Sequence, residues 1–183
     1  MQAMNTMSFP GFSSPAAGPD APLDMLAACH GRVEKQCQTL QRLSPHLALH
    51  GSDGAAREAA SAVMRYFDTA ARHHHEDEEQ SLFPALLEAM AGSDAVCIRA
   101  LTQALALQHR QLEVRWQSLR DKLQTIAEGR TVALQAALVD DFVAAYRSHI
   151  QQEDTELLPM AQRLLDDAAL ARIGQAMRVR RGL

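Results

Sequence analysis

Residues 67–84 read FDTAARHHHEDEEQSLFP, and residues 142–159 read FVAAYRSHIQQEDTELLP. Both stretches fit the pattern F-x2-A-x-R-x-H-x3-E-x5-P without a gap. The alignment pairs equivalent residues of the two copies: His74 with His149, and Glu78 with Glu153. A purification tag would not be repeated elsewhere in the chain, so the histidine triplet belongs to a duplicated element of the fold.

Four stripes of apolar residues in the sequence have the spacing of α-helices. Their members recur at alternating steps of three and four residues, which places them on one face of a helix. The first and third stripes share the pattern H-x2-apolar-E, so the repeat extends over both halves of the chain. The stripes cover residues 23–40, 63–85, 98–126 and 134–160. Each includes one histidine at a position predicted to be buried: His30, His74, His109 and His149.

Four long amphipathic helices joined by short connections predict an all-α protein with an up-down-up-down four-helix bundle. Residues 22–165 are expected to form this bundle. Residues 166–183 are expected to add a short extra C-terminal helix and a basic tail. Residues 1–21 are rich in Pro, Gly, Ser and Ala and have no helical periodicity, which predicts a flexible N-terminal arm.

Proline, glycine and capping residues predict where the helices begin and end. Pro45 is predicted to end the first helix, and Ser52 or Asp53 is predicted to cap the second. Pro84 and Pro159, one in each copy of the repeat, are predicted to kink or end their helices. Further breaks are expected at residues 92–94 and 128–129.

The composition of the chain excludes several classes of protein. Its 183 residues include 18 Lys+Arg and 22 Asp+Glu, for a net charge of −4, whereas proteins that bind nucleic acid or anionic membranes are usually basic. No run of about 18 apolar residues is present, so no segment is predicted to span a membrane. The three cysteines are widely spaced and form no C-x2-C pair, which favours a reducing, cytoplasmic environment.

The two H-x3-E pairs of the repeat have the spacing of metal ligands. Residues four apart lie on the same face of a helix, so an imidazole nitrogen and a carboxylate oxygen can reach one metal site. With the histidines of the first and third helices, the chain offers four imidazoles and two carboxylates. Such a set suits iron, manganese, copper or zinc better than calcium or magnesium, and two carboxylates that can bridge favour a two-metal site.

A single histidine on an apolar stripe is more often a hydrogen-bonded core residue than a ligand. Here all four stripes carry a histidine, and two of them add Glu78 or Glu153 on the same face. A glutamate is rarely buried without a partner, because removing its charge from water is costly. The pattern therefore predicts a metal site rather than an ordinary core.

The half-motif H…H-x3-E, present twice in this order, resembles the hemerythrin-like, or HHE cation-binding, family. The resemblance covers residues 22–165. It implies a four-helix bundle with a non-heme di-iron centre, in which Glu78 and Glu153 bridge the two irons. Zinc or manganese would be the alternative metals. The terminal ligands that the resemblance implies are His30, His74, His109 and His149.

The chain differs from the oxygen-carrying members of that family at two positions. Those members have a fifth histidine four residues after the third-helix histidine, where this chain has Glu113. They also place an acid five residues after the last histidine, which corresponds to Asp154 here. The internal repeat favours Glu153, with Asp154 as the alternative ligand. The set of four histidines and two glutamates is more similar to family members that handle iron, respond to nitric oxide or repair iron–sulfur clusters.

The sequence leaves open the roles of several polar residues near the predicted ligands. Glu34 and Glu113 each follow a predicted ligand by four residues and are either additional ligands or solvated acids. His73 and His75 project about 100° to either side of His74, so both are predicted to be solvated. Tyr146 is predicted to lie in the core or at its boundary. The acids predicted to lie on the exposed face are Glu76, Asp77 and Glu79.

Three functions remain open from the sequence. A di-iron centre with a free coordination position would bind oxygen, nitric oxide or peroxide, for sensing, detoxification or iron handling. The first alternative is a di-metal oxidase or peroxidase, for which a substrate-sized cavity reaching the metals is expected. The second alternative is a structural zinc-binding bundle that interacts with other proteins. The sequence does not decide whether the protein is an enzyme and assigns no catalytic residue.

Overall fold

The computed structural model describes residues 18–89 and 94–183, and this part of the chain is helical without any strand. The prediction of an all-α protein is thus confirmed. The predicted N-terminal arm lies outside the described residues up to residue 17. The α-helices, in chain order, are α1 (Pro22–His50), α2 (Gly54–Arg65), α3 (Arg72–Asp77), α4 (Phe83–Glu88), α5 (Asp94–Ala127), α6 (Ala136–Gln152), α7 (Leu158–Leu164) and α8 (Asp167–Arg180).

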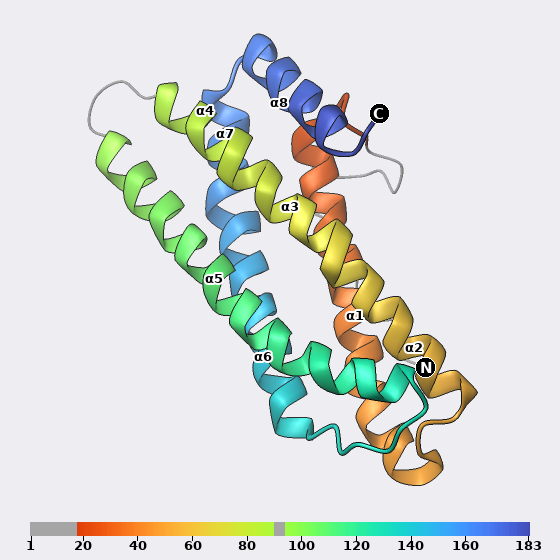
Figure 1. The fold of residues 1–183 in the computed structure, drawn as a ribbon. Coiled ribbons are helices and arrows are strands. Elements are labelled where there is room, and N and C mark those ends of the chain that lie inside the picture. The colour runs from red at the N-terminus through yellow and green to blue at the C-terminus, as the bar shows by residue number, and fades with distance from the viewer. Residues whose placement is uncertain (1–17, 90–93) are drawn as a thin grey trace, which may run out of the picture.

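Short π-helical segments join some of these α-helices into longer continuous ones. They are η1 (Tyr66–Ala71), η2 (Glu78–Leu82) and η3 (Glu153–Leu157). The first two connect α2, α3 and α4, and the third connects α6 to α7. The described part of the chain therefore consists of four long helical segments followed by α8, the short C-terminal helix (Figure 1).

The four long segments lie side by side, and α8 crosses one end of them (Figure 1). α1 packs against α2 and α6, and α5 packs against the same two helices, so the segments enclose a common interior. The connections 51–53 and 128–135 meet at the other end, where Ser52 Oγ donates a hydrogen bond of 2.8 Å to the carbonyl oxygen of Arg130. Within the described residues, no helix is both long and apolar enough to cross a membrane.

The interior consists of two apolar clusters with a polar layer between them. Each long segment contributes to both clusters and crosses the polar layer in between. The four histidines of the apolar stripes lie in this layer and are buried. Representative members of the first cluster are Val33, Phe67, Trp116 and Phe142. Representative members of the second, next to α8, are Leu26, Leu86, Leu105 and Leu157.

The first helix does not end at Pro45 as predicted. α1 continues through this proline to residue 50. Leu43 is buried on one side of the proline, and Leu47 packs against the same apolar cluster on the other side. Their burial compensates for the single backbone hydrogen bond that a proline cannot donate. Packing thus outweighs the local preference of the proline to end the helix.

The other helix ends agree more closely with the sequence. Asp53 caps α2, because its side chain accepts a hydrogen bond of 2.9 Å from the backbone N–H of Ala56. α5 ends just before Gly129, which has a positive φ of 78°. The fourth long segment begins at Ala136, so the buried Leu134 precedes the helix rather than belonging to it. The predicted break at 92–94 lies outside the described residues except for its last residue, at which α5 begins.

The two prolines of the repeat do not end their helices either. Each occupies the first turn of the α-helix that follows a π segment, Pro84 in α4 and Pro159 in α7. At that position the N–H that proline lacks is not needed. The residue before each proline donates its N–H to the carbonyl oxygen five residues back: Phe83 to Glu78, and Leu158 to Glu153. The π turns therefore let both helices continue past the prolines.

Replacing Gly174 with alanine should lower the free energy of unfolding by about 1–3 kcal/mol, because the new methyl group would overlap with the backbone carbonyl of Pro19. Gly31 offers a matched control, since it is also helical and nothing lies within 4 Å of an added methyl group. Gly31→Ala should raise the same free energy by about 0.5–1 kcal/mol. Urea unfolding of both variants measures the two changes. Equal effects would show that residues 18–20 do not pack on α8.

Candidate metal centre

Six polar side chains meet in the layer between the two apolar clusters. The Nε2 atoms of four histidines surround the carboxylates of Glu78 and Glu153, and neither glutamate has any exposed surface. The distances to Glu153 are 3.1 Å from His30 and 3.0 Å from His149, and those to Glu78 are 3.5 Å from His74 and 3.3 Å from His109. These are the six residues that the sequence analysis selected as ligands. The structure therefore brings all of them into one buried group.

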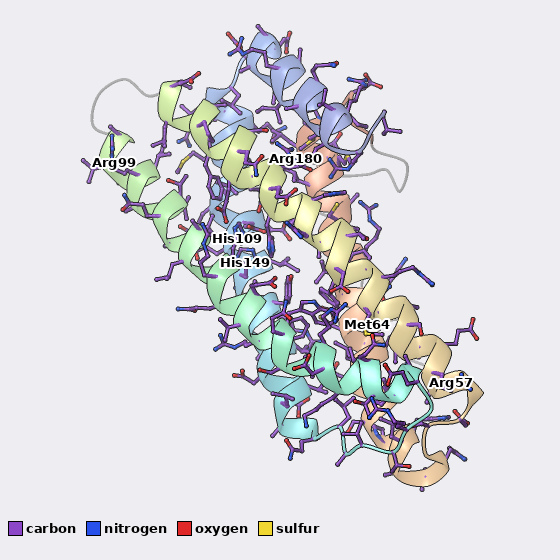
Figure 2. All side chains as sticks on the ribbon, in the orientation of Figure 1. Arg57, Met64, Arg99, His109, His149 and Arg180 are labelled. Atoms are coloured by element: carbon purple, nitrogen blue, oxygen red, sulfur yellow. The ribbon has the colours of Figure 1, made fainter. Side chains whose placement is uncertain are left out.

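Helical geometry determines how these side chains reach the layer. His109 lies within α5 and His149 near the end of α6, and Figure 2 shows the two close together in the interior. His30 comes from the first turns of α1. In the second and fourth long segments, a histidine is followed four residues later by the glutamate that begins a π segment. The four-residue spacing directs both side chains of each pair toward the same interior.

Two groups of four ligand atoms can be drawn among the six residues, and both groups include the two glutamates. One group is completed by His30 and His74, and the other by His109 and His149. The ligand atoms within each group lie within 4.8 Å of one another. This is the arrangement expected for two metal ions that share a pair of carboxylates.

The buried atoms of this group lack hydrogen bonds, which supports the fit to metal ions. All four oxygens of Glu78 and Glu153 are buried and make no hydrogen bond within residues 18–89 and 94–183. The same holds for Nε2 of His30, His109 and His149. Buried polar atoms are rarely left unsatisfied in folded proteins, because each costs about 1–3 kcal/mol. Here the unsatisfied atoms converge on common points, so cations would satisfy them together.

Acceptors on the outer side of three imidazoles determine which nitrogen faces the centre. The Nδ1 contacts pair His30 with Asp154 (2.7 Å), His109 with Glu79 (2.8 Å) and His149 with Gln108 (2.8 Å). An acceptor at Nδ1 keeps the proton there and leaves the Nε2 lone pair free to bind a metal. Asp154, the alternative ligand from the sequence, is thus a hydrogen-bond acceptor outside the group of six. Gln108 was not predicted, and its spacing from the ligands carries no signal for this role.

In the metal-free centre, burial and the nearby carboxylates shift the pKa values of the histidines in opposite directions. Burial alone would lower the pKa of His30 and His109, but the attraction of the carboxylates beside them outweighs it and raises each pKa to about 9. Burial would raise the pKa of Glu153, but the surrounding imidazoles, His149 foremost, hold it well below its usual value. Protonated imidazoles therefore balance the carboxylates of the metal-free protein. Bound cations would displace these protons.

We expect the metal-free protein to become less stable as the pH rises from 6.5, the ordinary pKa of histidine, to about 9, the pKa of His30 and His109 in the fold. The folded state binds more protons than the unfolded state in this range, so the free energy of unfolding falls with rising pH. Thermal unfolding after chelator treatment should give a lower melting temperature at pH 9 than at pH 6.5. His30→Gln should reduce this difference, because it removes one of the two groups with a raised pKa. A melting temperature that rises over this range would contradict the raised pKa values.

His75 is not solvated, contrary to the sequence prediction. Its ring is half-buried and stacks on His109, with the centroids 4.0 Å apart and the planes at 12°. Its Nε2 is buried and has no hydrogen-bond partner among the described residues. Burial and the neighbouring imidazoles, His109 first, lower the pKa of His75 well below its usual value. The prediction was wrong because α5 covers this side of α3, so the ring of His75 stacks on that of His109 instead of facing water.

Asp77 was predicted to be exposed and is buried instead. It has no exposed surface and forms ion pairs with Arg180 and Arg181 at the end of α8. Figure 2 shows Arg180 where α8 approaches the second long segment. The basic tail of the chain is thus folded against this segment. No local pattern in the sequence indicates this contact, because the partners are 103 and 104 residues apart.

The remaining acids near the centre take different positions. Glu79 is half-buried rather than exposed, because it accepts hydrogen bonds from both His109 and Arg110. Glu76 is also half-buried, beside Arg72. His73 is half-buried and belongs to none of the groups of possible ligand atoms among the described residues.

The two candidate additional ligands do not join the group. Glu34 is near the surface and pairs with Arg147 at 2.7 Å. Glu113 is exposed and accepts a hydrogen bond of 2.5 Å from Gln117. Tyr146 is buried in the first apolar cluster, as predicted for a core or boundary residue.

A cavity of about 440 Å³ lies beside the centre, between the second long segment and α5. The imidazoles of His75 and His109 form part of its wall. Apolar and aromatic side chains line another part: Phe67, Ala71, Leu112, Trp116 and Tyr146. Charged and polar side chains complete the lining: Arg72, Glu76, Glu79, Gln80, Arg110 and Glu113. A small molecule in this cavity would therefore contact a predicted ligand directly.

Comparisons with known proteins agree with this geometry. Residues 21–161 match the family model described as the hemerythrin HHE cation binding domain. The chain is also similar to a protein of Haemophilus influenzae (strain Rd) described as uncharacterized. The two are 30% identical over 160 residues, which is 87% of this chain and 90% of the relative.

Proposed function

Because the chain belongs to the hemerythrin HHE cation-binding family, we propose that it binds two non-heme iron ions in the polar layer of an up-down-up-down four-helix bundle. Glu78 and Glu153 would each contact both ions. His30 and His74 would complete the ligands of one ion, and His109 and His149 those of the other. The proposal includes a cytoplasmic location, which the three widely spaced cysteines favour.

One observation carries this proposal, namely that two groups of four ligand atoms overlap in the same two buried glutamates. A single structural zinc ion needs only four ligands and would leave two of the six residues without a role. Imidazole and carboxylate are the ligand types that suit iron at such a site. The acceptors at Nδ1 orient the imidazoles, and the apolar clusters on either side limit the access of water to the layer.

Bound iron would supply a coordination position for oxygen, nitric oxide or peroxide, and sensing, detoxification or iron handling are the functions that such binding serves. The residues of the chain hold and orient the ions and neutralise their charge with two carboxylates. His109 is the one histidine that α5 contributes to the group of six, and Glu113 occupies the position of the fifth histidine of oxygen-carrying members. We therefore propose a role other than simple oxygen transport.

Metal content and the optical spectrum, measured together on untagged protein from iron-replete cells, test the proposal. We expect about two irons per chain and near-ultraviolet absorption of a bridged ferric pair, both lost in His74→Ala. His73→Ala is the matched control, because this neighbouring histidine belongs to none of the groups of possible ligand atoms in the described part of the chain. One zinc ion per chain, together with no spectral change after anaerobic ferrous loading and exposure to air, would contradict the proposal and favour a structural zinc-binding bundle.

The cavity favours a second candidate function, that of a di-metal oxidase or peroxidase. Its volume of about 440 Å³ is sufficient for a small organic molecule, and His109 belongs both to its wall and to the group of six. A small-molecule reductant that is consumed by the iron-loaded protein with peroxide, but not by a Glu153→Ala variant, would support this function. Absence of turnover with a panel of phenols and aromatic amines would favour ligand binding alone.

A further inference from the structure

His75 lies between the cavity and the candidate metal centre. It is part of the cavity wall, and a nitrogen of its ring lies within 4.8 Å of ligand atoms of both His109 and His149. The ring centroid is 5.6 Å from that of His149 and 6.0 Å from that of Tyr146. Nothing in the sequence repeat calls for this residue, since Ile150 occupies the equivalent position in the other copy. Only one side of the centre therefore has this histidine.

The orientation of the ring argues against a role as a seventh metal ligand. A metal ion lies in the plane of the imidazole that binds it, about 2 Å from the nitrogen. The rings of His75 and His109 are nearly parallel, at 12°, and their centroids are 4.0 Å apart. Two such planes cannot both contain one ion at bonding distance. If His109 is a ligand, His75 in this position faces the same ion without binding it.

The buried nitrogen of His75 nevertheless requires a partner. Nε2 makes no hydrogen bond within residues 18–89 and 94–183, although it is inaccessible to solvent. A buried polar group without a partner is destabilising, so one that a native structure keeps calls for an explanation such as a bound ion or ligand. The stacking contacts with His109 and Tyr146 hold the ring in place, so the nitrogen has a fixed direction.

We propose that the Nε2–H of His75 donates a hydrogen bond to a small ligand bound on the His109–His149 side of the centre, which the ligand reaches through the adjacent cavity. The ligand class is a diatomic molecule or a small anion with an acceptor atom next to the atom that binds metal. The inference rests on the proposed di-iron function and adds to it the residue that recognises the ligand and the route by which the ligand enters. It also makes the two metal positions different from each other.

Titration of the iron-loaded protein with inorganic azide, followed by its optical spectrum, tests the hydrogen bond. His75→Leu should retain the wild-type iron content and bind azide about tenfold more weakly or worse, because a hydrogen bond to an anion is lost. His75→Gln, which keeps an N–H donor, should recover part of the affinity. His73→Leu, the matched control on the same helix, should bind azide as the wild type does.

The iron content separates the ways in which the inference can fail. An azide affinity that is unchanged in His75→Leu would overturn it. Loss of iron from His75→Leu, with the helical content intact by circular dichroism, would overturn it as well, because His75 would then be a ligand. A wild-type protein that takes up no iron would overturn the proposed function and, with it, this inference.

The entry route is tested by a change of charge in the cavity wall. Glu113 is exposed and lines the cavity, and Glu156 is exposed on the fourth long segment. Glu113→Lys should raise the association rate of azide about two- to tenfold at low ionic strength, and salt should remove the effect. Glu156→Lys makes the same change in net charge and should have less effect. Equal rates for the two variants would overturn the cavity as the route.

Discussion

Replacing Glu153 with alanine is expected to remove most of the bound metal while leaving the chain folded. Loss of an outer hydrogen-bond partner of a metal ligand typically weakens binding by about 10–100-fold. Loss of the carboxylate that the proposed centre shares between two ions should therefore weaken it by more than about 100-fold. The metal content should fall from about two ions per chain to less than one after dialysis. Elemental analysis and circular dichroism of the same samples measure the two quantities.

The neighbouring acids provide a graded series of controls on one turn of the helix. Asp154→Asn alters the acceptor at His30 and should weaken metal binding by about 10–100-fold. Glu156→Ala removes an exposed acid and should have no effect. A larger loss of metal in Asp154→Asn than in Glu153→Ala would identify Asp154 as the ligand. That outcome would contradict the assignment from the internal repeat.

Replacing Arg180 and Arg181 together with alanine is expected to lower the free energy of unfolding by about 3–5 kcal/mol, because Asp77 would remain buried without a partner. Each single substitution should lower the free energy of unfolding by less, since one arginine would still pair with the carboxylate of Asp77. Urea unfolding at neutral pH measures these differences.

A double-mutant design separates the ion pair from other effects. Adding Asp77→Ala to the double arginine variant should restore part of the lost stability, because the unpaired carboxylate is removed as well. Glu76→Ala, at the adjacent and partly exposed pair with Arg72, should change the free energy of unfolding by less than about 1 kcal/mol. A triple variant no more stable than the double arginine variant would show that the charge of Asp77 is not the cause.

The sequence predicted the helices well where burial alone determines them. The period of apolar residues reports directly on the face of a helix that packs, and all members of the third stripe are buried: Ile98, Leu101, Leu105, His109, Leu112, Trp116, Leu119, Leu123 and Ile126. The predicted helix end at Pro45 was wrong, and the helices also continue past Pro84 and Pro159, where a kink or an end was predicted. Pro45 is retained inside α1 by packing on both sides, and π turns accommodate Pro84 and Pro159. Neither packing nor a π turn can be read from a proline and its immediate neighbours.

In the candidate site, too, the sequence predicted some residues and missed others. The six ligand candidates could be selected from the sequence, because a helix places an H-x3-E pair on one face. The repeat then identifies His74, among the three consecutive histidines, as the equivalent of His149. The surroundings could not be selected. The contacts of Gln108 with His149 and of Arg180 with Asp77 depend on how separate helices are rotated and docked against each other. The position of His75 likewise depends on the docking of α5 against α3, because its ring stacks on that of His109.

The π segments also restrict how the length of this chain can change over time. A π turn contains one residue more than the α-helical turn that it replaces. Deleting one residue within η2 would restore a regular helix and leave the direction of the following side chains unchanged. A deletion in the regular helix α5 before Leu112 would instead rotate the following side chains by about 100° and turn the buried Leu112 away from the core. η2 and η3 begin at equivalent glutamates, so the extra residue occupies the same place in both copies of the repeat. If the copies descend from one duplicated half, the insertion was already present in that ancestor.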